Sequence, residues 1–147
     1  MIIISHRGLI NGPNKKIENS FTELKKNIEK YKSLIFELDI WLKNNDLFLG
    51  HDFPDKRIAI ENLIPLKEKI IIHIKFIDNN SKEMLEQIFY NKFHYFCHQD
   101  DAFTITSKGW PWIHPNYGLK RNSICVLPEN FTDLSKLTTL KDKNLLG

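Results

Sequence analysis

The sequence predicts a parallel α/β fold, because strand patterns alternate with helix patterns along its first two thirds. Residues 2–5 are apolar and mostly β-branched, as in a buried parallel strand. Apolar residues then recur at helical spacing over 21–31, and a second strand pattern spans 34–42. A helix between two strands carries the chain back across the sheet and leaves the strands parallel. We therefore expect a parallel sheet covered by helices.

Capping and turn signals predict where the elements begin and end. Ser20 and Glu23 fit the S-x-x-E capping box, so the first helix is expected to begin there. Asn44 and Asn45 are typical of a turn after the second strand, and Ser81 is expected to cap a second helix. The remaining expected elements are strands over residues 70–76, 95–98, 103–107, 111–114 and 123–127, and a short helix over 133–140.

The composition is that of an ordinary globular protein. The chain has 147 residues, of which 41% are hydrophobic and 27% charged, and we expect a single domain over 1–147. The net charge of +3 comes without a basic block, which argues against nucleic-acid binding. No apolar run is long enough to span a membrane, and the apolar start is too short for a secretory signal. Cys97 and Cys125 form no metal-binding pattern, so we expect a cytoplasmic protein with reduced thiols.

Two carboxylates in the second expected strand form the sharpest local signal. Glu37 and Asp39 stand two residues apart, so both side chains point to the same face of the strand. Two like charges this close repel each other unless a cation lies between them. Carboxylate oxygens favour Mg²⁺ or Ca²⁺. The alternative is an edge strand with both carboxylates in water.

Two histidines are expected beside these carboxylates. A turn centred on Asn45 pairs Asp39 with His51 across the hairpin, and His6 ends the neighbouring strand. Each histidine alone is more often an ordinary surface or core residue. Together, two histidines that flank a metal site are the arrangement that a general acid and a general base require.

Two cationic residues also fall at the ends of expected strands. Arg7 follows the first strand, and Lys75 lies late in the strand expected over 70–76. Guanidinium and ammonium groups both bind anions, and a phosphate suits them. We therefore expect Arg7 and Lys75 to hold a phosphate of the substrate.

Four short motifs follow one another over residues 6–52, namely His6-Arg7-Gly8, Glu18-Asn19-Ser20, Glu37-Leu38-Asp39 and His51-Asp52. In this order and rough spacing they resemble the glycerophosphodiester phosphodiesterases, whose pattern is HRG, ENT or ENS, ExD and HD. The later Ile72-His73-Ile74-Lys75 is similar to the ExK strand of that family. The N-terminal third of the chain carries most of the match.

The resemblance implies a TIM-type (β/α) barrel of the phospholipase-C-like kind. It also implies a phosphoric diester hydrolase of lipid metabolism, which cleaves a glycerol-linked phosphodiester with a divalent metal through a cyclic phosphate. The residue roles that it implies are His6 and His51 as the catalytic acid and base, Arg7 and Lys75 at the substrate phosphate, Glu18 as the residue that orders the site, and Glu37 and Asp39 as metal ligands.

Two features depart from the family pattern. His73 stands where the family has a third carboxylate ligand. Either its imidazole is the third ligand, which also admits Mn²⁺ or Zn²⁺, or it is no ligand. A (β/α)₈ barrel takes about 250 residues. A chain of this length therefore implies a shortened or incomplete barrel with reduced helices in the C-terminal half, or one that lacks its last strands. Its open strand edges favour self-association.

Other interpretations remain open at this point. The chain could be a catalytically inactive relic or a phosphate-binding module on the same barrel. It could also be a phospholipase-D-like or inositol-lipid phosphodiesterase. Trp110, Trp112, His98 and His114 fit either an aromatic site for a choline-like leaving group or ordinary core packing.

Overall fold

The computed structural model describes residues 3–99, 101–114, 117 and 123–125. Contacts along the chain divide it into two compact units, one of Ile2–Tyr95 and one of Phe96–Gly147 together with Met1. All the residues of the candidate site lie in the first.

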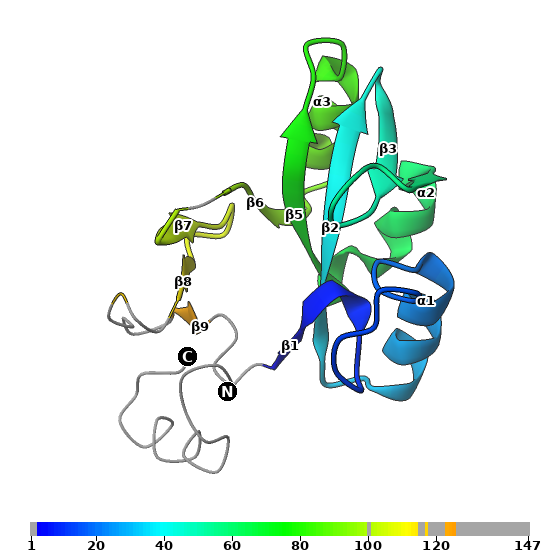
Figure 1. Ribbon diagram of the computed structural model, residues 1–147. Helices are drawn as coiled ribbons and strands as arrows, with labels where there is room; N and C mark the ends of the chain where they lie inside the picture. The colour runs from blue at the N-terminus through cyan, green and yellow to red at the C-terminus, as the bar shows by residue number, and fades with distance from the viewer. Residues whose placement is uncertain (1–2, 100, 115–116, 118–122, 126–147) are drawn as a thin grey trace. The chain divides into compact units, whose positions relative to one another are not determined.

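The first unit is built on a mixed sheet with the strand order β4-β3-β2-β5-β6, and β1 pairs with β2 outside this path (Figure 1). The strands are β1 (Ile4–Ser5), β2 (Ile35–Lys43), β3 (Asp46–Leu49), β4 (Lys56–Ile58), β5 (Ile70–Ile77) and β6 (His94–Phe96). The helices are α1 (Phe21–Lys30), α2 (Ile60–Leu63) and α3 (Lys82–Tyr90), with 3₁₀ turns η1 (His6–Gly8) and η2 (Ile64–Lys69).

β2 is the central strand of this sheet. One of its edges pairs in parallel with β5 from Phe36 to Leu42. Its other edge pairs first in parallel with β1 and then antiparallel with β3. Because β1 pairs with the start of β2, the η1 turn that follows β1 comes beside the middle of β2. This arrangement brings residues from three distant parts of the sequence to one strand.

The hydrophobic core lies on one face of the sheet. The even-numbered residues of β2, together with Ile70, Ile72 and Ile74 of β5, join one buried cluster. The helices contribute apolar residues to the same cluster, among them Leu24 of α1 and Ile88 of α3. Figure 1 shows the three helices gathered along this side of the strands. The odd-numbered side chains Glu37, Asp39 and His73 lie on the opposite face, where the apolar Ile71 is buried beside them.

The β2–β3 hairpin differs by one residue from the expected register. Asn44 and Asn45 both have a positive φ, of 52° and 61°, as a two-residue type I′ turn requires. Ile40 pairs with Leu49, so Asp39 lies opposite Gly50 and not opposite His51. The backbone N–H of Gly50 accordingly donates to the Asp39 carbonyl at 3.2 Å. The turn has its centre between the two asparagines, whereas the prediction placed it on the second.

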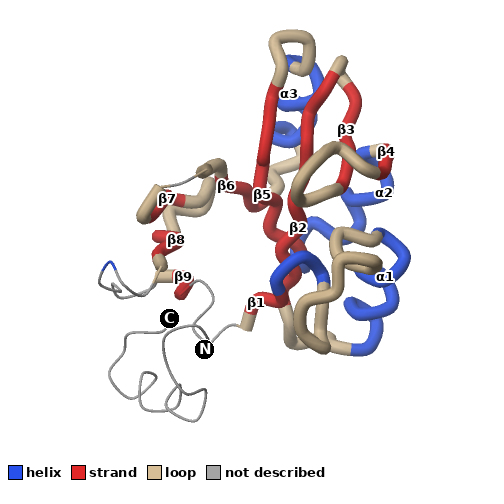
Figure 2. Tube along the Cα trace, in the orientation of Figure 1, coloured by secondary structure: helices blue, strands red, loops and turns tan. Residues whose placement is uncertain are grey.

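The expected TIM-type barrel is wrong. Among the described residues the strands form one open mixed sheet and a separate three-stranded sheet, and neither closes on itself (Figure 2). The reason is the path of the chain after β2. β3 and β4 return antiparallel through short links, and a crossover to a parallel strand comes only with α2 and η2. A barrel of this type needs a helix after each strand. The described residues form a small α/β arrangement instead.

The second unit holds a small sheet with the order β7-β8-β9, made of β7 (Phe103–Ile105), β8 (Pro111–Ile113) and β9 (Ile124–Cys125). Trp112 of β8 stacks on Phe96 with ring centroids 4.1 Å apart and is largely buried. The packing role proposed for Trp112 fits this contact.

Most expected elements of the described residues are confirmed, with shifts at their ends. The strands expected over 34–42 and 70–76 are β2 and β5, and the two expected helices are α1 and α3. Ser20 and Ser81 precede these helices, but neither makes a capping hydrogen bond through its side chain. β4, α2 and both 3₁₀ turns were not expected, and the helix expected over 133–140 lies outside the described residues. In the part of the chain that the structure describes, no helix is both long and apolar enough to cross a membrane.

Candidate metal centre

Three buried side chains meet on the odd-numbered face of the sheet. Glu37 and Asp39 of β2 are each 1% exposed, and His73 of β5 is 7% exposed. The parallel register sets Asp39 directly beside His73, with Glu37 two residues earlier on the same face. One ligand atom from each of the three lies within 4.8 Å of the others. The β2–β5 pairing thus creates a compact group of two carboxylates and one imidazole.

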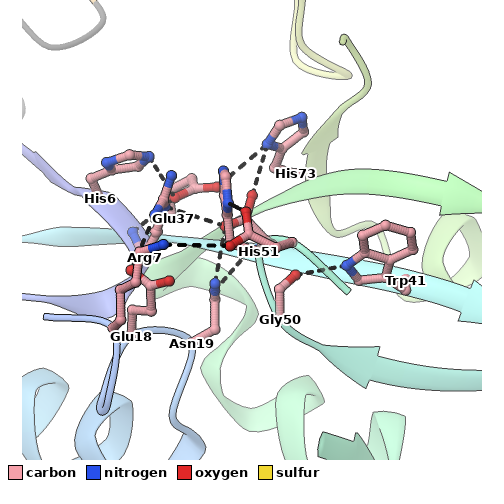
Figure 3. A network of polar contacts seen from close by, with 12 residues as sticks. His6, Arg7, Glu18, Asn19, Glu37, Trp41, Gly50, His51 and His73 are labelled. Carbon is pink, nitrogen blue, oxygen red and sulfur yellow. Dashed lines mark hydrogen bonds and ion pairs between the residues drawn. The ribbon is translucent and has the colours of Figure 1, made fainter. Parts of the chain in front are cut away.

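Each carboxylate of this group uses one oxygen for a protein donor and keeps the other for the interior of the group. Glu37 Oε2 accepts the backbone N–H of Arg7 at 2.8 Å, and Asp39 Oδ2 accepts from Asn19 Nδ2 at 3.0 Å. Glu37 Oε1 and Asp39 Oδ1 are buried and, apart from the His73 ring, accept no hydrogen bond from the described residues. These two oxygens face His73 Nδ1, at 3.8 Å and 3.0 Å (Figure 3). Convergence of this kind suits a divalent cation.

The pKa values of the two buried carboxyls shift in opposite directions. Loss of water and then the charge of Asp39 raise the pKa of Glu37 well above its ordinary value. Burial also acts to raise the pKa of Asp39, but its polar contacts with His73 and Asn19 outweigh that effect and lower it. The chain alone therefore favours one negative charge on this pair, and a bound cation would favour two.

The η1 turn supplies the next layer of the site. Arg7 has a left-handed backbone with φ 53°, which directs its N–H to Glu37 and its side chain along the cluster. Its Nη1 pairs with Glu18 at 3.0 Å, and its Nε lies 3.6 Å from Asp39 Oδ2. His6 precedes it, with Nε2 3.9 Å from Glu37 Oε2 and a side chain 43% exposed. The structure thus places His6 and Arg7 beside the carboxylates and joins Glu18 to them through Arg7, while the roles assigned to these three residues stay predictions.

His51 reaches the site from the loop after β3. Its Nδ1 lies 2.6 Å from Asp52 Oδ1, and this contact lowers the pKa of Asp52. The charge of His51 also acts on Asp39, which locates the ring near the cluster despite the shifted hairpin register. Gly50 makes this loop possible, because its φ is +151° and a Cβ there would collide with the Phe53 carbonyl oxygen.

Lys75 lies at an irregularity in β5. The pairing passes from Ile40 with Ile74 to Trp41 with Phe76, so Lys75 is an additional residue in a β-bulge. Its charge acts to lower the pKa of Glu37, although burial and Asp39 dominate that group. Lys75 is therefore close enough to the carboxylates to influence an anion bound there.

Asn19, to which the sequence prediction gave no role, makes three hydrogen bonds within the site, two with Asp39 and one with Arg7. The resemblance implied the ordering role for its neighbour Glu18 instead. The available signal was Asn19 itself, a residue type that adopts left-handed backbone readily. His98, Trp110, Trp112 and His114 belong to the second unit, and the aromatic leaving-group site, one of the two interpretations given for them, stays a prediction.

Comparisons with known proteins do not assign this chain to a family. No protein-family model matches the chain, and no solved structure matches it significantly. The curated proteins include a 3-dehydroquinate synthase of Buchnera aphidicola subsp. Cinara cedri (strain Cc) that is 30% identical over 104 residues. That match covers 71% of this chain and 25% of the relative. The chain therefore spans about a quarter of the length of the curated relative it matches.

These findings correct the resemblance to the glycerophosphodiester phosphodiesterases. No model of that family matches, and the curated relative carries the name of a different enzyme. The activity that the resemblance implied is therefore wrong as well. This applies to hydrolysis of a glycerol-linked phosphodiester, to the phosphoric diester hydrolase class and to a place in lipid metabolism. It also applies to the inactive and phospholipase-D-like alternatives on the same barrel. Motifs of two or three residues reflect only the local geometry at the end of a strand. The same local geometry occurs in proteins that catalyse different reactions, so such motifs do not identify a family.

The raised pKa of Glu37 predicts how the stability of the metal-free chain depends on pH. A group with a raised folded-state pKa stabilises the fold fully below its unfolded pKa, and this stabilisation is lost as the pH rises through the folded value. In EDTA, we therefore expect Glu37→Gln to gain stability relative to the unmodified chain as the pH rises from about 5 to about 8. Urea unfolding at several pH values measures the difference. A difference that does not change with pH would mean that the Glu37 carboxyl has an ordinary pKa.

Proposed function

We propose that the Ile2–Tyr95 unit binds one divalent cation through Glu37, Asp39 and His73 and performs acid–base chemistry on a small anion. The observation that carries this proposal is the pair of buried carboxylate oxygens, Glu37 Oε1 and Asp39 Oδ1, which face one imidazole nitrogen at 3.8 Å and 3.0 Å and accept no other hydrogen bond from the described residues. A buried carboxylate oxygen without a donor is costly, and a cation bound between these oxygens removes that cost.

The donor set supports an ion that accepts nitrogen as well as oxygen. Two carboxylates alone suit Mg²⁺ or Ca²⁺, the ions expected first from the sequence. His73 adds an imidazole within the same cluster. Imidazole favours Mn²⁺, Fe²⁺ or Zn²⁺ over the two hard ions. We therefore propose Mn²⁺ or Zn²⁺ as the ion of this site.

Titration calorimetry with Mn²⁺ or Zn²⁺ tests the site. We expect one ion per chain, and we expect Glu37→Gln, Asp39→Asn and His73→Ala each to weaken binding by at least tenfold, about 1.4 kcal/mol. Mg²⁺ and Ca²⁺ are expected to bind less tightly than Mn²⁺.

The matched control is Glu83→Gln, which removes a carboxylate that accepts a hydrogen bond from Asn45 outside the site. It should leave the affinity for the ion unchanged. Absence of binding by the folded chain, or an affinity equal to that of the unmodified chain in all three ligand variants, would refute the metal site.

His6 and His51 are the proposed proton-transfer groups. They reach the cluster from two different segments, so they flank the ligands on separate backbones. Asp52 holds His51 through Nδ1, which leaves Nε2 as the nitrogen that exchanges a proton. A bound divalent cation supplies polarisation of a substrate oxygen and a lower pKa for a hydroxyl or water. One histidine then accepts a proton and the other donates one.

Lys75 and Arg7 support an anionic substrate. Arg7 is partly neutralised by Glu18 and Asp39, whereas no ion pair of Lys75 occurs among the described residues. Lys75 is therefore the main anion-binding residue of this proposal, and Arg7 assists it.

Inorganic phosphate serves as the probe for the anion site. In the Mn²⁺-loaded chain we expect Lys75→Met to weaken phosphate binding by about tenfold, because one full positive charge near the anion is removed. Phosphorus NMR line broadening by Mn²⁺ measures the binding. Lys67→Met is the control, because Lys67 contacts the Asn91 carbonyl away from the cluster. Equal phosphate binding in the unmodified chain and in Lys75→Met would contradict the role of Lys75.

The curated relative favours a second candidate, because its name specifies formation of 3-dehydroquinate. We propose this as the first reaction to assay, by complementation of a bacterial strain that lacks 3-dehydroquinate synthase. Growth that depends on Glu37 would support the activity. Failure to complement with a stably expressed chain would exclude it and would not affect the metal-binding test.

A further inference from the structure

Asn19 connects the two segments that build the metal site. Its side chain is 2% exposed and lies between the η1 turn and β2. Its Oδ1 accepts the backbone N–H of Asp39 at 2.9 Å, and its Nδ2 donates to Asp39 Oδ2 at 3.0 Å. Its own backbone N–H donates to the Arg7 carbonyl at 3.0 Å. One asparagine therefore fixes both the backbone and the carboxylate of Asp39.

The two side-chain bonds of Asn19 restrict how Asp39 can bind an ion. Nδ2 occupies Oδ2, so only Oδ1 faces His73 and the cluster. Without Nδ2, the carboxylate could rotate toward the Arg7 Nε, which lies 3.6 Å from Oδ2, or present both oxygens to the ion. Hydrogen bonds of this kind to a ligand orient it and raise metal affinity.

We infer that Asn19 is a positioning residue of the metal site, which holds Asp39 as a ligand through Oδ1 alone. This inference rests on the proposed metal binding by Glu37, Asp39 and His73. It goes beyond the three ligands, because it makes the metal affinity of the site depend on a residue that does not contact the ion.

The backbone at Asn19 allows a clean test. Its φ is 51°, in the left-handed region that glycine adopts without strain. Asn19→Gly therefore removes both side-chain hydrogen bonds and keeps the backbone path. Asn45 offers a matched control, because it has a φ of 61° and two side-chain hydrogen bonds of its own, to Glu83 and to the Met84 N–H. Asn45→Gly makes the same chemical change at the hairpin turn.

The experiment compares Mn²⁺ affinity by calorimetry, the visible spectrum of bound Co²⁺, and urea unfolding in EDTA. We expect Asn19→Gly to weaken Mn²⁺ binding by about 10–100-fold and to change the Co²⁺ spectrum, which reports the geometry of the ligands. Asn45→Gly should lower stability while both metal readouts stay as in the unmodified chain. If the role of Asn19 were purely structural, Asn19→Gly would lower the stability and would leave the Mn²⁺ affinity and the Co²⁺ spectrum unchanged.

Asn19→Asp is the second variant, and it replaces the first if Asn19→Gly fails to fold. It keeps the shape of the side chain and an acceptor for the Asp39 N–H, but its carboxylate cannot donate to Oδ2. We expect weaker Mn²⁺ binding despite the added negative charge.

The outcomes separate the two proposals. If the unmodified chain binds no Mn²⁺, the metal site itself fails, and the role of Asn19 with it. If the unmodified chain binds Mn²⁺ and the Asn19 variants bind it equally well with the same Co²⁺ spectrum, the positioning role is refuted and the metal site stands.

Discussion

The burial of two carboxylates beside an imidazole is the constraint on which the rest of the site depends. Glu37 and Asp39 are both 1% exposed, and an uncompensated buried charge costs several kcal/mol. The protein donors around them satisfy one oxygen of each. The raised pKa of Glu37 reflects the buried negative charge that these donors do not compensate, since burial and the charge of Asp39 both oppose its ionisation. A divalent cation would neutralise this charge and would bind the two remaining oxygens, Glu37 Oε1 and Asp39 Oδ1.

The surrounding backbone is shaped to meet this constraint. Arg7 and Asn19 both adopt left-handed φ values, and each thereby turns a donor toward a carboxylate of β2. The β1–β2 pairing sets the η1 turn beside the middle of β2, and the β2–β5 register sets His73 beside Asp39. The apolar residues on the opposite face anchor these strands in one core. The fold thus separates a packing face from a polar face on the same two strands.

Periodicity in the sequence was sufficient to predict β2, β5, α1 and α3, because their apolar residues report directly which face is buried. It also predicted that Glu37 and Asp39 share a face. The hairpin register was missed by one residue, because apolar alternation does not reveal where a two-residue turn has its centre. The roles of Asn19 and of the bulge at Lys75 depend on pairing between distant segments, which a local pattern does not contain. The barrel was inferred from short motifs, which do not determine the path of the strands that connect them.

Anomalous diffraction from crystals of the Mn²⁺-loaded chain tests the central claim most directly. If this cluster binds the ion, one anomalous peak lies about 2.0–2.3 Å from each of Glu37 Oε1, Asp39 Oδ1 and His73. Asp39 Oδ2 then remains hydrogen-bonded to Asn19. The absence of a peak at this cluster under saturating Mn²⁺, or a peak bound only by residues elsewhere, would contradict the account.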